Sequence, residues 1–161
     1  MTLRPNARGQ LWLLWAALVL FGGCRTHPLS DGRYAFTADQ IVVDDCGILP
    51  DAASLWDGVL IQDGNFVRIQ YDLYDSELTG RYREVDESFY VDGSASKVSG
   101  TPRGVACTFD LVNIHIDGAL GPDDDVFTGV VRVHTRTLGD DRCECDLQTT
   151  FTANFVPGSA P

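Results

Sequence analysis

Five cysteines are the residues of this chain whose types and spacing point to definite chemistry. Cys24 follows an apolar stretch near the N-terminus, and the other four are Cys46, Cys107, Cys143 and Cys145. Zinc sites and thiol redox motifs usually place two residues between paired cysteines, whereas a single residue separates Cys143 from Cys145. An even set of four cysteines in an exported domain is typical of disulfides. We therefore expect two disulfides and no metal site.

The positions of the four cysteines narrow their pairing. Cys143 and Cys145 would point to the same side of one strand, and a bond between two residues so close in sequence would be strained. Each of them should therefore pair with either Cys46 or Cys107, and both assignments remain open. A bridge that closes a long loop contributes on the order of 4 kcal/mol in the chain-entropy model.

Two histidines, His115 and His134, are predicted to face outward on neighbouring strands. Such a pair can hold a metal ion, but solvated surface side chains are the commoner outcome and the one we expect. The sequence contains neither a Gly-x-Ser-x-Gly elbow nor a His-Glu-x-x-His zinc motif. With the cysteines assigned to bridges, no thiol nucleophile remains. We predict no catalytic residue, no metal and no cofactor, and an enzyme is the least favoured function.

The first 23 residues have the layout of a signal peptide. Arg4 and Arg8 precede an unbroken apolar run of 11 residues, from 11 to 21. A membrane-spanning helix needs about 20 apolar residues, whereas the apolar core of a signal peptide needs about 7–15. We therefore expect residues 1–23 to be removed and to take no part in the fold.

The residues around Cys24 resemble the lipobox of bacterial lipoprotein precursors. The segment reads Leu20-Phe21-Gly22-Gly23-Cys24, with Phe21 where that family usually has leucine. The resemblance implies that Cys24 is diacylated, becomes the mature N-terminus and receives an N-acyl chain such as palmitate, which anchors the protein to a membrane. Arg25 is not the aspartate that retains such lipoproteins at the inner membrane. The resemblance thus implies the outer membrane of a bacterial cell envelope.

The charge of the chain limits its partners. The full chain has 12 basic and 23 acidic residues and a net charge of −11. Loss of the signal peptide would remove Arg4 and Arg8 and no acidic residue, which leaves the mature chain at −13. Such a charge repels phosphate backbones. We exclude nucleic acid, which leaves a protein partner or a small apolar ligand in addition to the membrane contacted through the lipid on Cys24.

Residues 32–156 are predicted to form a single all-β domain, with a tether before it over 24–31 and a flexible tail after it over 157–161. Apolar and polar residues alternate along most of the domain, which is typical of antiparallel strands that bury one face. We predict eight strands, over residues 33–44, 58–62, 65–73, 77–83, 87–93, 104–117, 125–137 and 143–155.

The strand count also predicts the topology. If consecutive strands pair in a meander, their directions alternate, and all four paired cysteines fall at one end of the sheet. An even number of strands lets the first and last pair antiparallel and close a barrel. A two-sheet β-sandwich is the alternative architecture.

In two of the predicted strands, the inward-facing positions switch between odd and even residue numbers partway along the strand, which we call a parity change. The segment 104–117 starts with inward positions at Cys107, Phe109 and Leu111 and then switches to Val112, Ile114 and Ile116, which predicts a β-bulge near Leu111. The first strand shifts in the same way before Ile41, which we place inward together with Val43.

The start of the first strand resembles the lipocalins. That family places Gly-x-Trp where this chain has Gly32-Arg33-Tyr34. The resemblance implies a closed barrel around a small apolar ligand. The inward residues that would line such a cavity are Tyr71, Tyr82, Phe109 and Val131. We nevertheless favour a non-catalytic interaction or structural module, with a lipocalin-like carrier as the alternative.

Overall fold

The structure is a computed structural model that describes residues 29–49, 54–121, 123, 125–139 and 141–158. The predicted signal peptide, Cys24 and the tether up to residue 28 lie outside these residues, as does the tail from residue 159. These assignments therefore stay predictions. Across the described ranges, no helix is long and apolar enough to cross a bilayer.

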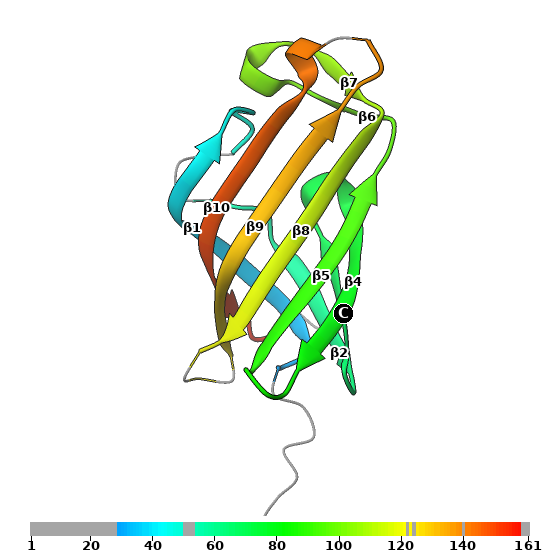
Figure 1. Cartoon of the computed structure of the whole chain (residues 1–161). Coiled ribbons are helices and arrows are strands. Elements are labelled where there is room, and N and C mark those ends of the chain that lie inside the picture. The colour runs from blue at the N-terminus through cyan, green and yellow to red at the C-terminus, as the bar shows by residue number, and fades with distance from the viewer. Residues whose placement is uncertain (1–28, 50–53, 122, 124, 140, 159–161) are drawn as a thin grey trace, which may run out of the picture.

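Eight strands form one closed antiparallel barrel (Figure 1). Around the barrel the order is β1-β10-β9-β8-β5-β4-β3-β2, so the ladder closes where β1 and β2 pair. The strands are β1 Gly32–Asp44, β2 Gly58–Asp63, β3 Phe66–Tyr71, β4 Ser76–Arg83, β5 Ser88–Ala95, β8 Leu111–Leu120, β9 Val126–Arg136 and β10 Cys145–Phe155. The prediction of an all-β meander of eight strands closed into a barrel is confirmed, and the sandwich is wrong.

Short elements complete the chain. Two short strands, β6 Val98–Gly100 and β7 Cys107–Phe109, form a separate two-stranded sheet. Three single-turn 3-10 helices are η1 Leu73–Asp75, η2 Pro102–Gly104 and η3 Asp141–Cys143.

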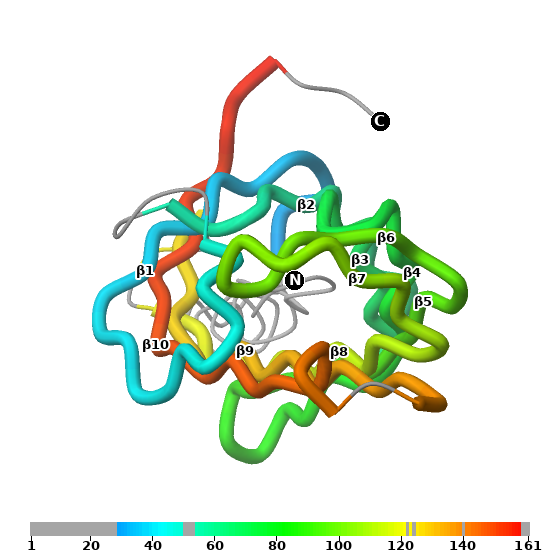
Figure 2. Tube along the Cα trace, turned by 90° about the horizontal axis from the view of Figure 1, so that it is seen from above, coloured from blue at the N-terminus to red at the C-terminus, as the bar shows by residue number. Residues whose placement is uncertain are grey.

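The barrel has two ends, which we call the base and the cap. The base holds the start of β1 and the turns that join β2 to β3, β4 to β5 and β8 to β9 (Figure 1). The cap holds the segments that follow β1 and precede β10, together with the β6–β7 sheet, and these lie over the mouth of the barrel in Figure 2. The two ends are therefore closed by different parts of the chain.

The chain enters the barrel at the base. Leu29 is buried there, and the hydroxyl of Ser30 donates to Asp125 Oδ1 at 2.7 Å. The carboxylate of Asp31 accepts a hydrogen bond from the backbone N–H of Gln62, also at 2.7 Å. The last three residues of the predicted tether are thus packed against the barrel.

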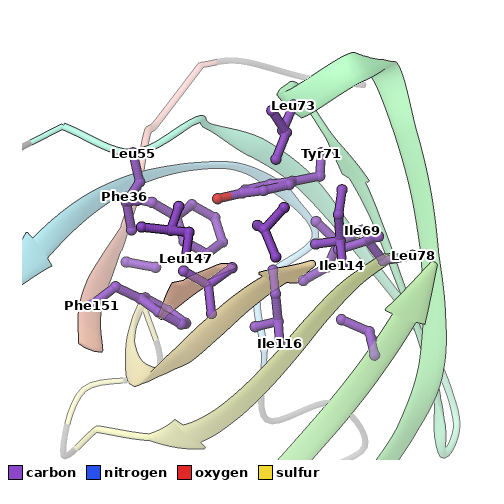
Figure 3. Close-up of a cluster of buried hydrophobic side chains, with 14 of the residues drawn as sticks. Phe36, Leu55, Ile69, Tyr71, Leu73, Leu78, Ile114, Ile116, Leu147 and Phe151 are labelled. Atoms are coloured by element: carbon purple, nitrogen blue, oxygen red, sulfur yellow. The ribbon is translucent and has the colours of Figure 1, made fainter. Parts of the chain in front are cut away.

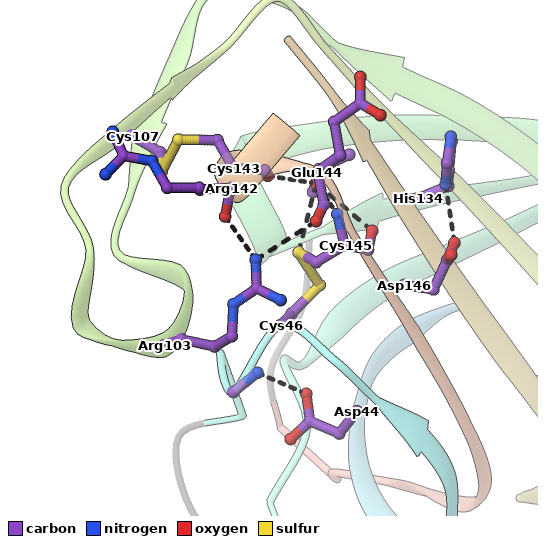
Figure 4. Close-up of a disulfide and its surroundings, with 12 residues drawn as sticks. Asp44, Cys46, Arg103, Cys107, His134, Arg142, Cys143, Glu144, Cys145 and Asp146 are labelled. Carbon is purple, nitrogen blue, oxygen red and sulfur yellow. Dashed lines mark hydrogen bonds and ion pairs between the residues drawn. A yellow bond between two sulfur atoms is a disulfide. The ribbon is translucent and has the colours of Figure 1, made fainter. Parts of the chain in front are cut away.

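Both disulfides lie at the cap (Figure 4). Cys46 is bonded to Cys145 and Cys107 to Cys143, with Cα–Cα separations of 5.0 and 5.8 Å. The expectation that Cys143 and Cys145 each pair with one of the other two is confirmed, and the tertiary structure selects the assignment. The backbone N–H of Arg103 donates to the carbonyl of Cys46 at 2.7 Å. The cap is therefore tied to the segment that leads into β10.

The predicted bulge near Leu111 is wrong, although the parity change behind it is present. β7, which pairs with β6, ends at Phe109, Asp110 follows it, and β8 begins at Leu111 in the barrel. The Asp110 carboxylate accepts from the backbone N–H of Leu138 at 2.6 Å. The chain changes parity because it passes from one sheet to another, not because one ladder contains an extra residue.

The predicted change in β1 takes the form of two register shifts against β10. They fall between Ala38 and Gln40 and between Ile41 and Val43. Ile41 is 40% exposed, so its predicted inward position is wrong. Extra residues at the shifts twist a strand away from its neighbours, which removes Ile41 from the core.

Most of the remaining predicted inward positions are buried, but Val43 and Leu111 are only half-buried. Alternate residues of β3, β9 and β10 face the interior, where aliphatic and aromatic side chains form one continuous core (Figure 3). Examples are Val67, Ile69, Tyr71, Phe127, Val131, Val133, Leu147, Phe151 and Ala153. The period-two pattern therefore identified the core face of these strands correctly.

Candidate functional site

The four residues predicted to line a cavity are all buried but do not form one wall. Tyr71 ends β3 near the cap, and Val131 lies midway along β9. Tyr82 pairs across the sheet with Phe89, whereas Phe109 belongs to β7 and contacts the ring of Tyr74. The four are thus spread from the base to the cap.

The base half of the interior is filled with aromatic rings. Phe127 is at the centre, and its ring centroid lies 4.9 Å from Tyr34, 5.1 Å from Phe89, 5.6 Å from Phe36 and 5.8 Å from Phe151. Tilted and edge-to-face pairs at such distances are the favourable ring geometries. The rings therefore form a plug that belongs to the protein itself.

Two glycines make room for this aromatic plug. Gly118 and Gly129 face each other across β8 and β9. A Cβ atom at Gly118 would lie 2.4 Å from the ring of Phe89, and one at Gly129 would lie 1.9 Å from the carbonyl oxygen of Asp117. Any larger residue at either position would displace a ring or a strand.

Two buried tyrosines differ in how their hydroxyls are satisfied. Tyr34, in the base half, donates to the carbonyl of Ser30 at 3.0 Å. Burial and then the charge of Asp125 raise the pKa of Tyr34 to about 12. Tyr71, in the cap half, is fully buried, and its hydroxyl has no hydrogen-bond partner in the part of the chain that the structure describes. A buried polar group without a partner calls for an explanation, such as a bound water or ligand.

The Tyr71 hydroxyl lies among apolar groups and points into the core, toward the side where Phe36 and Leu55 lie (Figure 3). The ring of Tyr71 contacts those of Phe36 at 5.5 Å and Trp56 at 6.4 Å. Burial, followed by the charges of Asp57 and Asp72, raises the pKa of Tyr71, so this hydroxyl stays protonated and is able to donate.

The outer face of β5, β8, β9 and β10 carries a shallow groove of about 710 Å³. Its polar lining consists of Asp92, Ser94, Asn113, His115, Arg132, His134, Asp146 and Gln148. Two further hollows bounded by described residues also open on the outside of the barrel, one over Gly118 and Gly129 and one beside Phe66.

Within this groove, His115 is held between two carboxylates. Its Nδ1 lies 2.5 Å from Asp92 Oδ1, and its Nε2 lies 3.0 Å from Asp117 Oδ2. Arg132 donates to the same Asp117 oxygen at 2.7 Å. Partial burial alone would lower the pKa of His115, but the hydrogen bonds to the two aspartates and their charges outweigh it and raise that pKa.

The pKa of Asp117 moves in the opposite direction. Partial burial by itself would raise it, but hydrogen bonds from Arg132 and His115 and their positive charges lower it. The four side chains therefore form a network that is most strongly bound when His115 is protonated and the aspartates are ionised.

His134 lies in a second cross-strand row and hydrogen-bonds Asp146 Oδ1 through Nδ1 at 2.7 Å (Figure 4). The next residue in the row is Asn113, and Ser94 lies one strand further. Because neighbouring strands are about 4.8 Å apart, the two inter-strand spacings between His134 on β9 and Ser94 on β5 separate them by roughly 10 Å. The aspartate thus orients the imidazole, but Ser94, the hydroxyl in this row, lies beyond the reach that nucleophilic catalysis needs.

No group of three or more His, Cys, Asp or Glu side chains in the described ranges is arranged to hold a metal ion. His115 and His134 do face outward, as the alternation predicted. The imidazole of each contacts the carboxylate of an aspartate. These aspartate partners were not predicted from the sequence. A signal was present, because Asp92, Asp117 and Asp146 occupy outward positions of the same strands.

Comparisons of the chain with protein-family models, with curated proteins and with solved structures give no match.

Proposed function

We propose that the chain is the precursor of a lipid-anchored protein of the bacterial envelope, whose barrel is a non-catalytic interaction module. The observation that carries the proposal is the aromatic plug around Phe127, because a carrier needs a hollow interior. The polar groove on the outer face supports surface recognition instead. The imperfect lipobox at residues 20–24 supports the anchor.

The geometry at the base also supports an anchored arrangement. The buried Leu29 lies five positions after Cys24, and a fully extended chain of that length spans at most about 18 Å. A lipid on Cys24 would thus hold the base near the membrane surface. The cap and the end of β1 would then face away from it.

The anchor is tested on the mature protein from a bacterial envelope. Mass spectrometry should find an acylated Cys24 as the N-terminus, and the C24S variant should move from the membrane fraction to the soluble fraction. A longer, unmodified N-terminus would contradict the anchor. A variant with R25S serves as the matched control, because it changes the neighbouring residue and keeps the thiol.

The interaction module is tested by extracting the protein purified from its native envelope with organic solvent. Mass spectrometry of the extract should show no small molecule at a stoichiometric amount, apart from the acyl chains on the cysteine. Recovery of one apolar compound at one equivalent would make the protein a carrier.

A carrier is the second candidate, and one observation favours it. The unpartnered Tyr71 hydroxyl would serve as the polar anchor for a ligand held in the cap half of the interior. If an extracted compound is lost in Y71F while Y34F keeps it, the carrier is correct and the interaction module is not.

A further inference from the structure

Over the second half of β1, one edge of the strand has no ladder partner among the residues that the structure describes. β2 pairs only with Gly32, Arg33 and Tyr34, and a single bridge then joins Thr37 to Ser54. From residue 38 to residue 44, β10 is the sole ladder partner among the described residues. Figures 1 and 2 show this cyan end of β1 at the rim of the barrel beside β10.

The side of β1 that faces β10 is firmly held. Nine residue pairs join the two strands, from Tyr34 with Phe155 to Asp44 with Leu147. The hydroxyl of Thr149 adds a bond to the carbonyl of Gln40 at 2.9 Å, and that of Thr152 donates to Asp39 Oδ2 at the same distance. The segment is therefore a fixed strand with one open edge.

Apolar side chains are exposed along this segment. Ile41 and Val42 are 40% and 53% exposed. Val42 falls at the register shift and has no ladder partner on β10, so both side chains are accessible to a partner at this edge. The segment also lacks the lysine and proline residues with which proteins commonly protect an exposed edge.

The charge around the edge is negative. No lysine or arginine occurs between Arg33 and Arg68, and none follows Arg142, so β1 after Arg33, β2 and β10 carry only acidic charges. Asp39 and Asp44 border the exposed pair of Ile41 and Val42. A partner that binds here must match this negative charge.

We infer that residues 38–44 of β1 bind an extended, positively charged segment of a partner protein, which adds a strand to the barrel edge. Backbone hydrogen bonds supply the pairing, Ile41 and Val42 supply apolar contacts, and the aspartates select lysine or arginine. This inference rests on the proposed interaction module and names its partner class.

A second copy of the chain is a poorer occupant of the same edge. Antiparallel pairing of two copies of residues 39–44 would place Asp39 of each opposite Asp44 of the other. Like charges directly opposite each other destabilise a strand pair. The net charge of −11 on each chain adds to the repulsion.

The test uses the mature protein and a synthetic peptide of alternating valine and threonine with two lysines at each end. Binding is measured by fluorescence anisotropy at low salt, and the contact by hydrogen exchange. We expect the amides of residues 38–44 to gain protection, and binding to weaken as salt is added. Two control peptides are the same sequence with glutamate in place of lysine and the lysine peptide with alternate amides N-methylated. Both should fail to bind.

Two variants each gain two lysines, one variant at the edge of β1 and the other away from it. I41K/V42K blocks the edge and should weaken peptide binding by at least about tenfold. V85K/L138K puts two lysines on other exposed apolar residues, which lie in turns away from β1, and should keep the affinity of the parent protein. Unfolding midpoints of both variants establish that they are folded, and the N-methylated peptide tests the edge with no change to the protein.

Several results would overturn the inference. These are a lack of binding by the lysine peptide, equal binding by the N-methylated peptide, or protection confined to residues outside 38–44. A dimer that I41K/V42K dissociates would replace the basic partner with a second copy. Because the solvent extraction reports only on the barrel interior, a carrier result there and a failure at this edge are distinguishable.

Discussion

The base half and the cap half of the barrel are closed in different ways. In the base half, five aromatic rings pack around one another and the hydroxyl of Tyr34 is hydrogen-bonded to Ser30. In the cap half, two disulfides tie the covering segments to the start of β10, and the Tyr71 hydroxyl below them has no described partner. The base is closed by packing and the cap by covalent bonds.

The two halves of the barrel should therefore differ in how well they tolerate substitutions. Dense ring packing leaves no room at the base, so alterations there must cost free energy. The cap depends on covalent links, since its segments contain little regular structure besides two three-residue strands and the single-turn helices η2 and η3.

Removing a cap disulfide should have the largest effect. In the chain-entropy model, C46A/C145A should lower the free energy of unfolding by about 4.7 kcal/mol and C107A/C143A by about 3.8 kcal/mol. The order follows from the loops that the bridges close, with sequence separations of 99 and 36 residues. Urea unfolding at pH 7 measures both. Equal losses would mean that loop length is not what the bridges constrain.

Truncating the ring at the centre of the base should come next. F127A should cost about 4 kcal/mol because it leaves a cavity among four rings, and L147A in the cap half should cost about 3 kcal/mol. Both residues are fully buried, so the pair is matched in exposure. The same urea measurements apply. A larger loss for L147A than for F127A would show that the base is not the more tightly packed half.

The two tyrosines should respond with opposite signs. Y34F loses the bond to Ser30 and should destabilise the barrel by about 1 kcal/mol, whereas Y71F removes an unsatisfied buried hydroxyl and should stabilise it by about 1 kcal/mol. Denaturant unfolding of the two variants beside the parent measures the difference. Destabilisation by Y71F would reveal a bound water or ligand in the cap half.

The smallest effect should come from the outer face, through pH. The folded pKa of His115 is raised, so its stabilisation is complete below about pH 6.5 and is lost as pH rises through the folded pKa. The folded pKa of Asp117 is lowered, so its stabilisation is present above about pH 3.8 and is lost as pH falls through the folded value.

Unfolding free energies between pH 5 and pH 9 test this pH dependence. The decline above pH 6.5 should shrink in H115Q, because glutamine keeps a polar side chain without the titrating imidazole. H134Q is the matched control, since it leaves the contacts of His115 with Asp92 and Asp117 in place. An unchanged decline in H115Q would assign the pH dependence to other groups.

Much of the fold followed from local pattern, and the errors share one cause. The alternation along β3, β9 and β10 predicted the correct core faces, and the cysteine spacing limited the bridges to two assignments, one of which the structure shows. The bulge near Leu111 and the inward placement of Ile41 failed because each depends on which strand lies alongside. The alternation of inward and outward residues is encoded within one strand, whereas the strand that pairs with it comes from a distant part of the sequence.

The candidate sites were less predictable for the same reason. The alternation along the strands predicted the outward positions of His115 and His134, but the carboxylates that hold them come from adjacent strands. The open edge of β1 has no sequence signal of its own, because it exists only where β2 stops pairing after Tyr34. The Tyr71 hydroxyl has no hydrogen-bond partner among the described residues, and this too depends on groups far away in the sequence.

The sequence by itself determined the all-β class, the number of barrel strands and the pairing of each cysteine down to two choices. These follow from period-two burial and from the short reach of a disulfide, which local spacing encodes. Only the tertiary structure decided that Cys46 meets Cys145, that the rings fill the base, and that β1 keeps an open edge. These depend on contacts between distant segments, which form only when the barrel closes.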